Sequence, residues 1–171
     1  MTTGVGGRFA VMTARAPLHP SQLAFFIAHE LGHIALGHVS AGGSILEGPL
    51  MSSDAEDSSD TEEQAADAYA FELLAGNARF EVKANPARGT AKELADIAID
   101  TGKRLEITPG FVILCYGRST KNWPLATSAL KLLPDYNPQI AGLVNKALRS
   151  QLDSEMLSSE DLSYLDEVAA I

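Results

Sequence analysis

The sequence HELGH at residues 29–33 is the feature that most limits how this chain can fold. It lies in a segment where apolar residues recur at three- and four-residue spacing, which predicts one amphipathic helix from Ser21 to about His38. Residues four apart on a helix project from the same face, with Cβ atoms about 5 to 6 Å apart. His29 and His33 can therefore offer imidazole nitrogens to one metal ion, and the pattern predicts Zn²⁺.

Glu30 lies one residue round the same helix, about 100° from His29. Its carboxylate is then predicted beside the metal rather than on it, where it can take a proton from a bound water as a general base. The alternative is that both histidines are hydrogen-bonded core residues. Glu30 disfavours this alternative, because a carboxylate buried without a partner costs several kcal/mol.

A catalytic zinc usually has three protein ligands, and a second helix can supply the third. Glu63 and Asp67 share one face at i, i+4 spacing, so we expect Glu63 to bind zinc and Asp67 to accept the free N–H of a ligand histidine. Glu62 is the alternative ligand. The start of this helix also carries two possible capping boxes, Ser59 with Glu62 or Asp60 with Glu63.

Two further histidines are expected outside the metal site. His38 lies about 140° round the helix from His33, so we predict that it is not a ligand. His19 stands at the helix entrance and is expected to be a surface or capping residue. For the group that stabilises the oxyanion, Tyr69, Tyr116 and His38 are equal candidates.

The remaining pattern predicts several short elements. Two strands are expected at 8–14 and 111–117, and residues 40–60 read as a loop. Helices are expected after residue 60 and ending at Gly76-Asn77, and at 90–105, 123–133, 138–152 and 159–169, with Asn137 as an N-cap and Pro138 at the first helical position. We expect these elements to form a single cooperative folding unit, with residues 1–133 as its main domain and 134–171 as a helical extension.

Composition narrows the class of protein. With 46% hydrophobic and 20% charged residues, the chain suits a globular protein, and it has no apolar run long enough for a membrane helix. The net charge is −9, and residues 16–78 hold ten acidic residues but no Lys or Arg, which argues against binding nucleic acid directly and favours cations and basic partners. The single cysteine, Cys115, is expected to be buried, and a cytoplasmic location is expected.

Two segments together resemble the ImmA/IrrE family of zinc metallopeptidases. They are FFIAHELGHIALGHV and EEQAADAYAFELLAG, and the second matches the family pattern through Glu63, Ala66, Asp67, Tyr69, Ala70, Leu73 and Leu74. The resemblance implies an α+β fold, mostly helical, with thermolysin-like active-site helices beside a small β-sheet. It also implies cleavage of a protein substrate, a DNA-binding transcriptional repressor.

The sequence thus predicts a zinc-dependent endopeptidase with Glu30 as base, and with His29, His33 and Glu63 as metal ligands. A second hypothesis is a zinc-stabilised module that binds and sequesters a regulator without cutting it. The absence of a nearby cysteine disfavours a purely structural zinc site, because such sites normally close the fourth position with a protein ligand.

Overall fold

A computed structural model describes residues 2–5, 8–11, 19–39, 44–45, 61–82 and 89–168. The predicted loop at 40–60 lies outside these residues except for 44–45, and so do both proposed caps of the second helix, Ser59 and Asp60.

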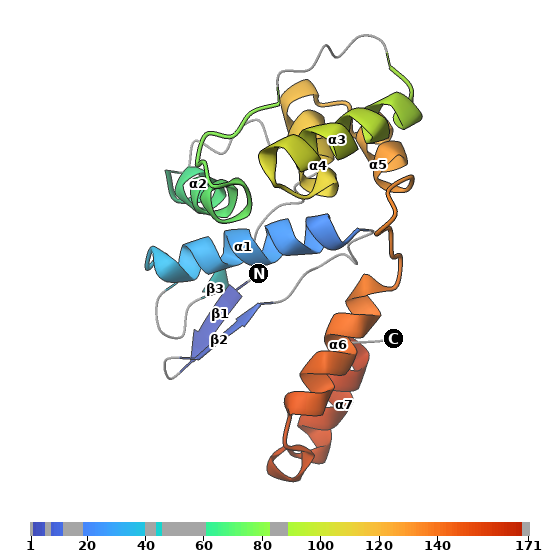
Figure 1. Cartoon of the computed structure of the whole chain (residues 1–171). Coiled ribbons are helices and arrows are strands. Elements are labelled where there is room, and N and C mark those ends of the chain that lie inside the picture. Colours follow the sequence, from blue (N-terminus) through green and yellow to red (C-terminus); the bar gives the residue numbers. More distant parts are fainter. Residues whose placement is uncertain are drawn as a thin grey trace.

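Helix α1 (Pro20–Ala35) occupies the middle of the fold. Figure 1 shows α2 (Thr61–Ala75), α3 (Ala91–Leu105) and α4 (Pro109–Thr120) on one side of it and a small sheet on the other. The predicted HELGH helix is confirmed, although it ends three residues before His38. The second helix ends before Gly76, as predicted, because Gly76 adopts a left-handed φ of 66°.

The core is made by helices α1 to α5. Helix α3 (Ala91–Leu105) begins with a capping box between Thr90 and Glu93, and α5 (Trp123–Leu130) follows Asn122 as its N-cap. The buried apolar cluster in the described residues comes from these helices and the turn after α5: Phe25, Ala28, Ala70, Phe71, Leu94, Ala95, Ala98, Phe111–Tyr116, Ala126, Ala129, Leu130 and Leu133.

The strand predicted at 111–117 is wrong, because these residues belong to helix α4 (Pro109–Thr120). Every residue from Gly110 to Gly117 is buried. A helix buried on all sides shows no polar face, so its sequence reads as a continuous apolar run like that of a central strand. Pro109 at the first turn preorganises φ for the helix, and the Pro-Gly pair therefore starts α4 rather than a turn.

Three short strands form an antiparallel sheet in the order β2-β1-β3. They are β1 (Thr2–Val5), β2 (Arg8–Val11) and β3 (Ser44–Ile45), with Thr2 opposite both Val11 and Ile45. The expected α+β class is corrected: the fold is a helical one, because the buried cluster of the described residues comes from helices α1 to α5 and the turn after α5.

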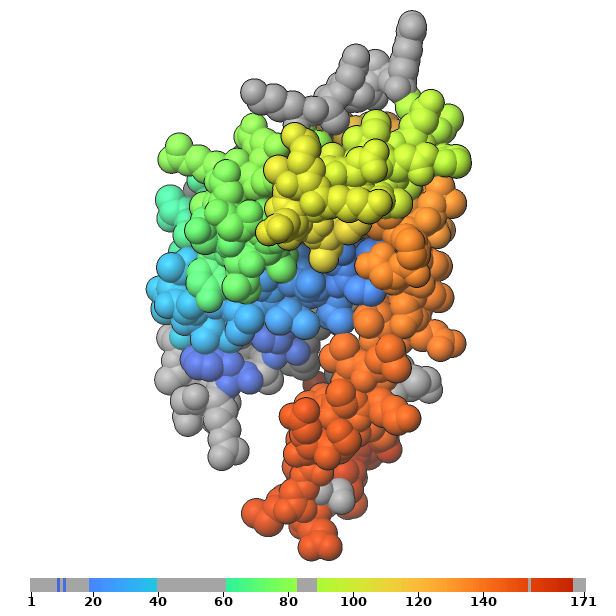
Figure 2. Space-filling model, in the orientation of Figure 1, coloured from blue at the N-terminus to red at the C-terminus, as the bar shows by residue number. Residues whose placement is uncertain are grey.

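Two helices follow the body of the protein, α6 (Ile140–Gln151) and α7 (Ser159–Val168), joined by a 3₁₀ turn at Ser154–Met156. They extend away from the other helices as a hairpin (Figures 1 and 2). The predicted cap is wrong by two residues: Gln139 is the N-cap, and the Asn137 side chain instead accepts the backbone N–H of Gln139. Among the described helices, none has the length and apolar character needed to cross a membrane.

Candidate metal site

The metal site predicted from the sequence depends on how closely α2 approaches α1. Gly32 makes this approach possible: a Cβ on Gly32 would lie 3.0 Å from the Cα and the carbonyl oxygen of Ala66. Ala66 is itself fully buried. Because small residues face each other at the crossing, the α2 backbone lies against the α1 surface, and the first turn of α2 reaches the two histidines.

Three side chains that could bind a metal meet at this crossing. The Nε2 atoms of His29 and His33 are 3.2 Å apart, and the two carboxylate oxygens of Glu63 lie 3.3 Å from His29 Nε2 and 3.4 Å from His33 Nε2. Both histidines are buried, whereas the Glu63 side chain is 29% exposed. The structure therefore brings together, from two separate segments, three residues that could hold a metal ion.

The spacing of these atoms can be tested against the metal expected from the sequence. A tetrahedral zinc site with ligand distances of about 2.0 to 2.1 Å has ligand atoms about 3.3 Å apart. The 3.2 Å between the two Nε2 atoms agrees with this value, and each of these nitrogens has one Glu63 oxygen at a similar distance, 3.3 Å for His29 and 3.4 Å for His33. Two imidazoles and one carboxylate are also the donor set of a catalytic zinc site with room for water. The residues present therefore fit zinc.

Asp67 holds the other ring nitrogen of His29. Its Oδ1 lies 2.9 Å from His29 Nδ1, and its Oδ2 forms an ion pair with Arg118 of α4. Burial raises the pKa of Asp67, but the hydrogen bonds from His29 and Arg118 outweigh it and leave that pKa below its ordinary value. Asp67 is thus an anion placed to accept the N–H of a metal-binding His29.

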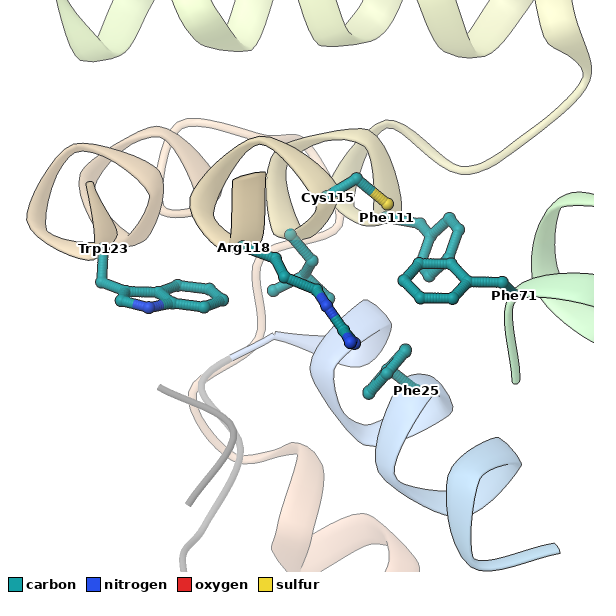
Figure 3. A pocket seen from close by; sticks show the side chains of 7 residues that line it. Phe25, Phe71, Phe111, Cys115, Arg118 and Trp123 are labelled. Atoms are coloured by element: carbon teal, nitrogen blue, oxygen red, sulfur yellow. The ribbon is translucent and has the colours of Figure 1, made fainter. Parts of the chain in front are cut away.

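Arg118 connects the site to the apolar core. Its guanidinium lies over the Phe71 ring, with Cζ 5.2 Å from the ring centroid. Figure 3 shows Arg118 beside a small cavity lined by aromatic side chains, including Phe25 and Phe111. Cys115 also lines this cavity, and burial raises the pKa of its thiol to about 12, so it stays neutral. Sequence reasoning missed Arg118, because no local spacing relates α4 to α2.

Glu30 and Glu62 differ sharply in their surroundings. Glu30 follows His29 on α1 and is 5% exposed, so it is buried in the protein. Glu62 is exposed and is not part of the group that could hold a metal. The geometry therefore favours Glu63 over Glu62 as the third ligand.

The two remaining histidines lie outside the group of residues that could hold a metal, and each has a polar partner. His19 caps α1 as expected, since its Nδ1 accepts the backbone N–H of Ser21, but it is fully buried rather than at the surface. Its Nε2 lies 3.1 Å from Asp135 Oδ1. His38 is not part of the metal-binding group, yet its Nδ1 lies 2.9 Å from His33 Nδ1.

The two tyrosines named for oxyanion stabilisation lie in different places. Tyr116 is 4% exposed and belongs to the core cluster, whereas Tyr69 is half-buried on α2, against Gly32. The oxyanion role itself stays a prediction.

Comparison with known protein families identifies this chain as a member of a peptidase family. The model of the family described as Peptidase U49 matches residues 17–121, which include α1, α2, α3 and α4 with all three residues of the metal-binding group. Neither the curated proteins nor the solved structures compared with the chain give a match. The resemblance to ImmA/IrrE proteins predicted a peptidase family, and this coarser statement is confirmed by a model described as Peptidase U49. The chain belongs to the Peptidase U49 family.

Proposed function

We propose that this protein is a zinc-dependent endopeptidase that hydrolyses a peptide bond in a protein substrate. The observation that carries the proposal is the meeting of His29, His33 and Glu63 at separations that suit a tetrahedral metal. Membership of a peptidase family supports the reaction type. The family description does not name the metal, so zinc rests on the donor set and its spacing.

His29, His33 and Glu63 would hold the ion, and zinc in such a site supplies Lewis-acid activation of a water molecule and of the scissile carbonyl. Glu30 would then accept a proton from the attacking water as the new C–O bond forms. As the C–N bond breaks, Glu30 would return that proton to the amine nitrogen. Glu30 suits this role because it is buried and directly follows His29 on α1.

The substrate is the least constrained part of the proposal. The acidic balance of residues 16–78 favours a segment with positive charge. The resemblance to the ImmA/IrrE family suggests a DNA-binding transcriptional repressor as the first substrate to test. An unbiased comparison of cleaved peptides in cell extract, treated with the wild type or with Glu30→Gln, would find a different substrate if the repressor is uncut.

Metal content and cleavage together test the proposal. We expect about one zinc per chain in the wild type, severe loss in Glu63→Gln, and no loss in the matched control Glu62→Gln. Elemental analysis after dialysis measures this. Folded wild-type protein that stays free of zinc after reconstitution would remove the proposed site.

Glu30→Gln separates an enzyme from a sequestering module. It keeps the side-chain shape but removes the base, so it should retain zinc and lose about 10² to 10⁴-fold in cleavage rate. Peptide mass spectrometry of the substrate gives the readout. If wild type and Glu30→Gln both bind the regulator and leave it intact, the protein sequesters its partner rather than cutting it.

A further inference from the structure

His38 occupies a position that the helix pattern alone does not predict. Helix α1 ends at Ala35, and Gly37 adopts a left-handed φ of 77° two residues later. The backbone N–H of His38 donates to the carbonyl of His33 at 2.9 Å, and that of Gly37 donates to the carbonyl of Ile34 at 3.2 Å. These two bonds form a Schellman motif, which turns the chain back over the last turn of the helix.

The motif places His38 against one particular side chain. In a Schellman motif the residue after the left-handed position packs on the helix residue five positions earlier, which here is His33. The two rings meet edge to face, with centroids 5.0 Å apart. His38 Nδ1 lies 2.9 Å from His33 Nδ1, on the opposite side of the His33 ring from the atom that faces Glu63.

This inference rests on the proposed metal site. Two ring nitrogens 2.9 Å apart need one hydrogen between them, donated by one ring and accepted by the other. If His33 binds a metal through Nε2, its Nδ1 carries the hydrogen, and His38 Nδ1 must accept it. We propose that His38 is a positioning residue that orients His33 for the metal through this hydrogen bond.

The two ligand histidines are then held in different ways. His29 donates to Asp67, a carboxylate that is fixed by Arg118. His33 donates to the imidazole of His38, which the backbone turn at Gly37 holds in place. The second arrangement depends on the conformation of a single glycine, so it can be disturbed without touching any group that binds the metal.

Zinc affinity, measured by chelator competition on the full-length protein, tests the role of His38. His38→Ala should weaken zinc about 10- to 100-fold while the stoichiometry at saturating zinc stays at about one. His38→Asn should recover most of the affinity, because its side-chain oxygen can accept the hydrogen near the position of Nδ1. The visible spectrum of the Co²⁺-loaded protein should change in His38→Ala and return toward the wild type in His38→Asn, because the spectrum reports ligand geometry.

A pair of glycine variants tests the turn itself. Gly37 and Gly76 both have left-handed φ angles after a helix, and a Cβ at either position meets nothing within 4 Å. Alanine at each position should therefore impose a similar backbone strain. Gly37→Ala should weaken zinc, whereas Gly76→Ala, at the far end of α2 from Glu63, should leave zinc affinity within about twofold of the wild type.

The outcomes separate this proposal from the proposed function. Wild-type zinc affinity and an unchanged Co²⁺ spectrum in His38→Ala would overturn the role of His38 and leave the metal site intact. Complete loss of the metal at saturating zinc would make His38 a ligand, which also overturns the proposal. If the wild type itself binds neither Zn²⁺ nor Co²⁺, the metal site and the role of His38 fail together.

Discussion

The helical body and the C-terminal hairpin are built from equally regular helices, but they bury very different amounts of their surface. In the body, eight consecutive residues of α4 are buried. In the hairpin, no residue of α6 is buried, although its apolar residues recur at helical spacing. The exposed apolar side chains there include Leu143, Val144, Leu148, Met156 and Tyr164.

The comparison shows that amphipathic sequence alone does not place a helix in the core. Most helical stability in proteins comes from packing an apolar face against another element. The body offers such partners to each helix, and residues 17–121 of the body also carry the family match. We therefore expect the stability and the metal site to depend on the body, and the hairpin to contribute little to either.

The largest effect on the free energy of unfolding should come from a core leucine of the body, with Leu148 of the hairpin as its matched control. Leu130 is 2% exposed and packs in the core, so Leu130→Ala should lower the free energy of unfolding by about 2 to 5 kcal/mol. Urea unfolding at neutral pH measures the change. A loss below about 1 kcal/mol would mean that the core is not the tightly packed unit that its burial indicates.

The next effect concerns metal affinity within the body. Asp67→Ala should weaken zinc by about 10- to 100-fold, because it removes the acceptor for the His29 N–H and leaves Arg118 without its carboxylate partner. Chelator competition gives the affinity. Asp96→Ala, which removes an exposed carboxylate paired with Lys92, serves as the control and should bind zinc like the wild type.

A smaller effect is expected at the junction of body and hairpin, where His19 meets Asp135. Burial lowers the pKa of His19, and the neighbouring Asp135 opposes this only in part. A histidine with a lowered folded-state pKa stabilises the fold fully above its unfolded pKa of about 6.5, and this contribution decreases as the pH falls below that value. The cap that it provides is worth about 0.5 to 2 kcal/mol.

His19→Asn isolates this contribution, because asparagine also caps helices but does not titrate in this range. In metal-free protein, the free energy of unfolding should fall less between pH 7 and pH 5 for His19→Asn than for the wild type. All other residues are the same in both proteins, so their contributions cancel in the comparison. Parallel pH curves for the two proteins would show that His19 is not held neutral by the fold.

The smallest effect should come from the hairpin. Leu148 is 47% exposed, so Leu148→Ala should change the free energy of unfolding by no more than about 0.5 kcal/mol and leave zinc affinity unchanged. The urea measurement used for Leu130→Ala applies directly. A loss as large as that of Leu130→Ala would show that the apolar face of α6 is covered in solution.

The predicted division of the chain at residue 133 stays a prediction. The burial contrast between α5 and α6 agrees with a change of environment near that point, since Leu133 is 3% exposed and no residue of α6 is buried. Stability measurements on the two leucine variants would sharpen this boundary.

By itself, the sequence determined the features that depend on neighbours along one helix. The i, i+4 spacing placed His29 and His33 on one face of α1, and the same spacing related Glu63 to Asp67 on α2. The spacing of apolar residues also located most of the helices, because this pattern depends on residues within a few turns of one another.

Only the tertiary structure decided which side chains meet across helices. The close approach at Gly32 brought Glu63 to the histidines, and Arg118 reached Asp67 from α4. The apolar run of α4 forms a buried helix rather than a strand. The sequence could not tell the two apart, because burial on every side removes the helical periodicity of the apolar residues. His38 met His33 because a left-handed turn at Gly37 ended the helix, whereas a helical wheel assumes that the helix continues.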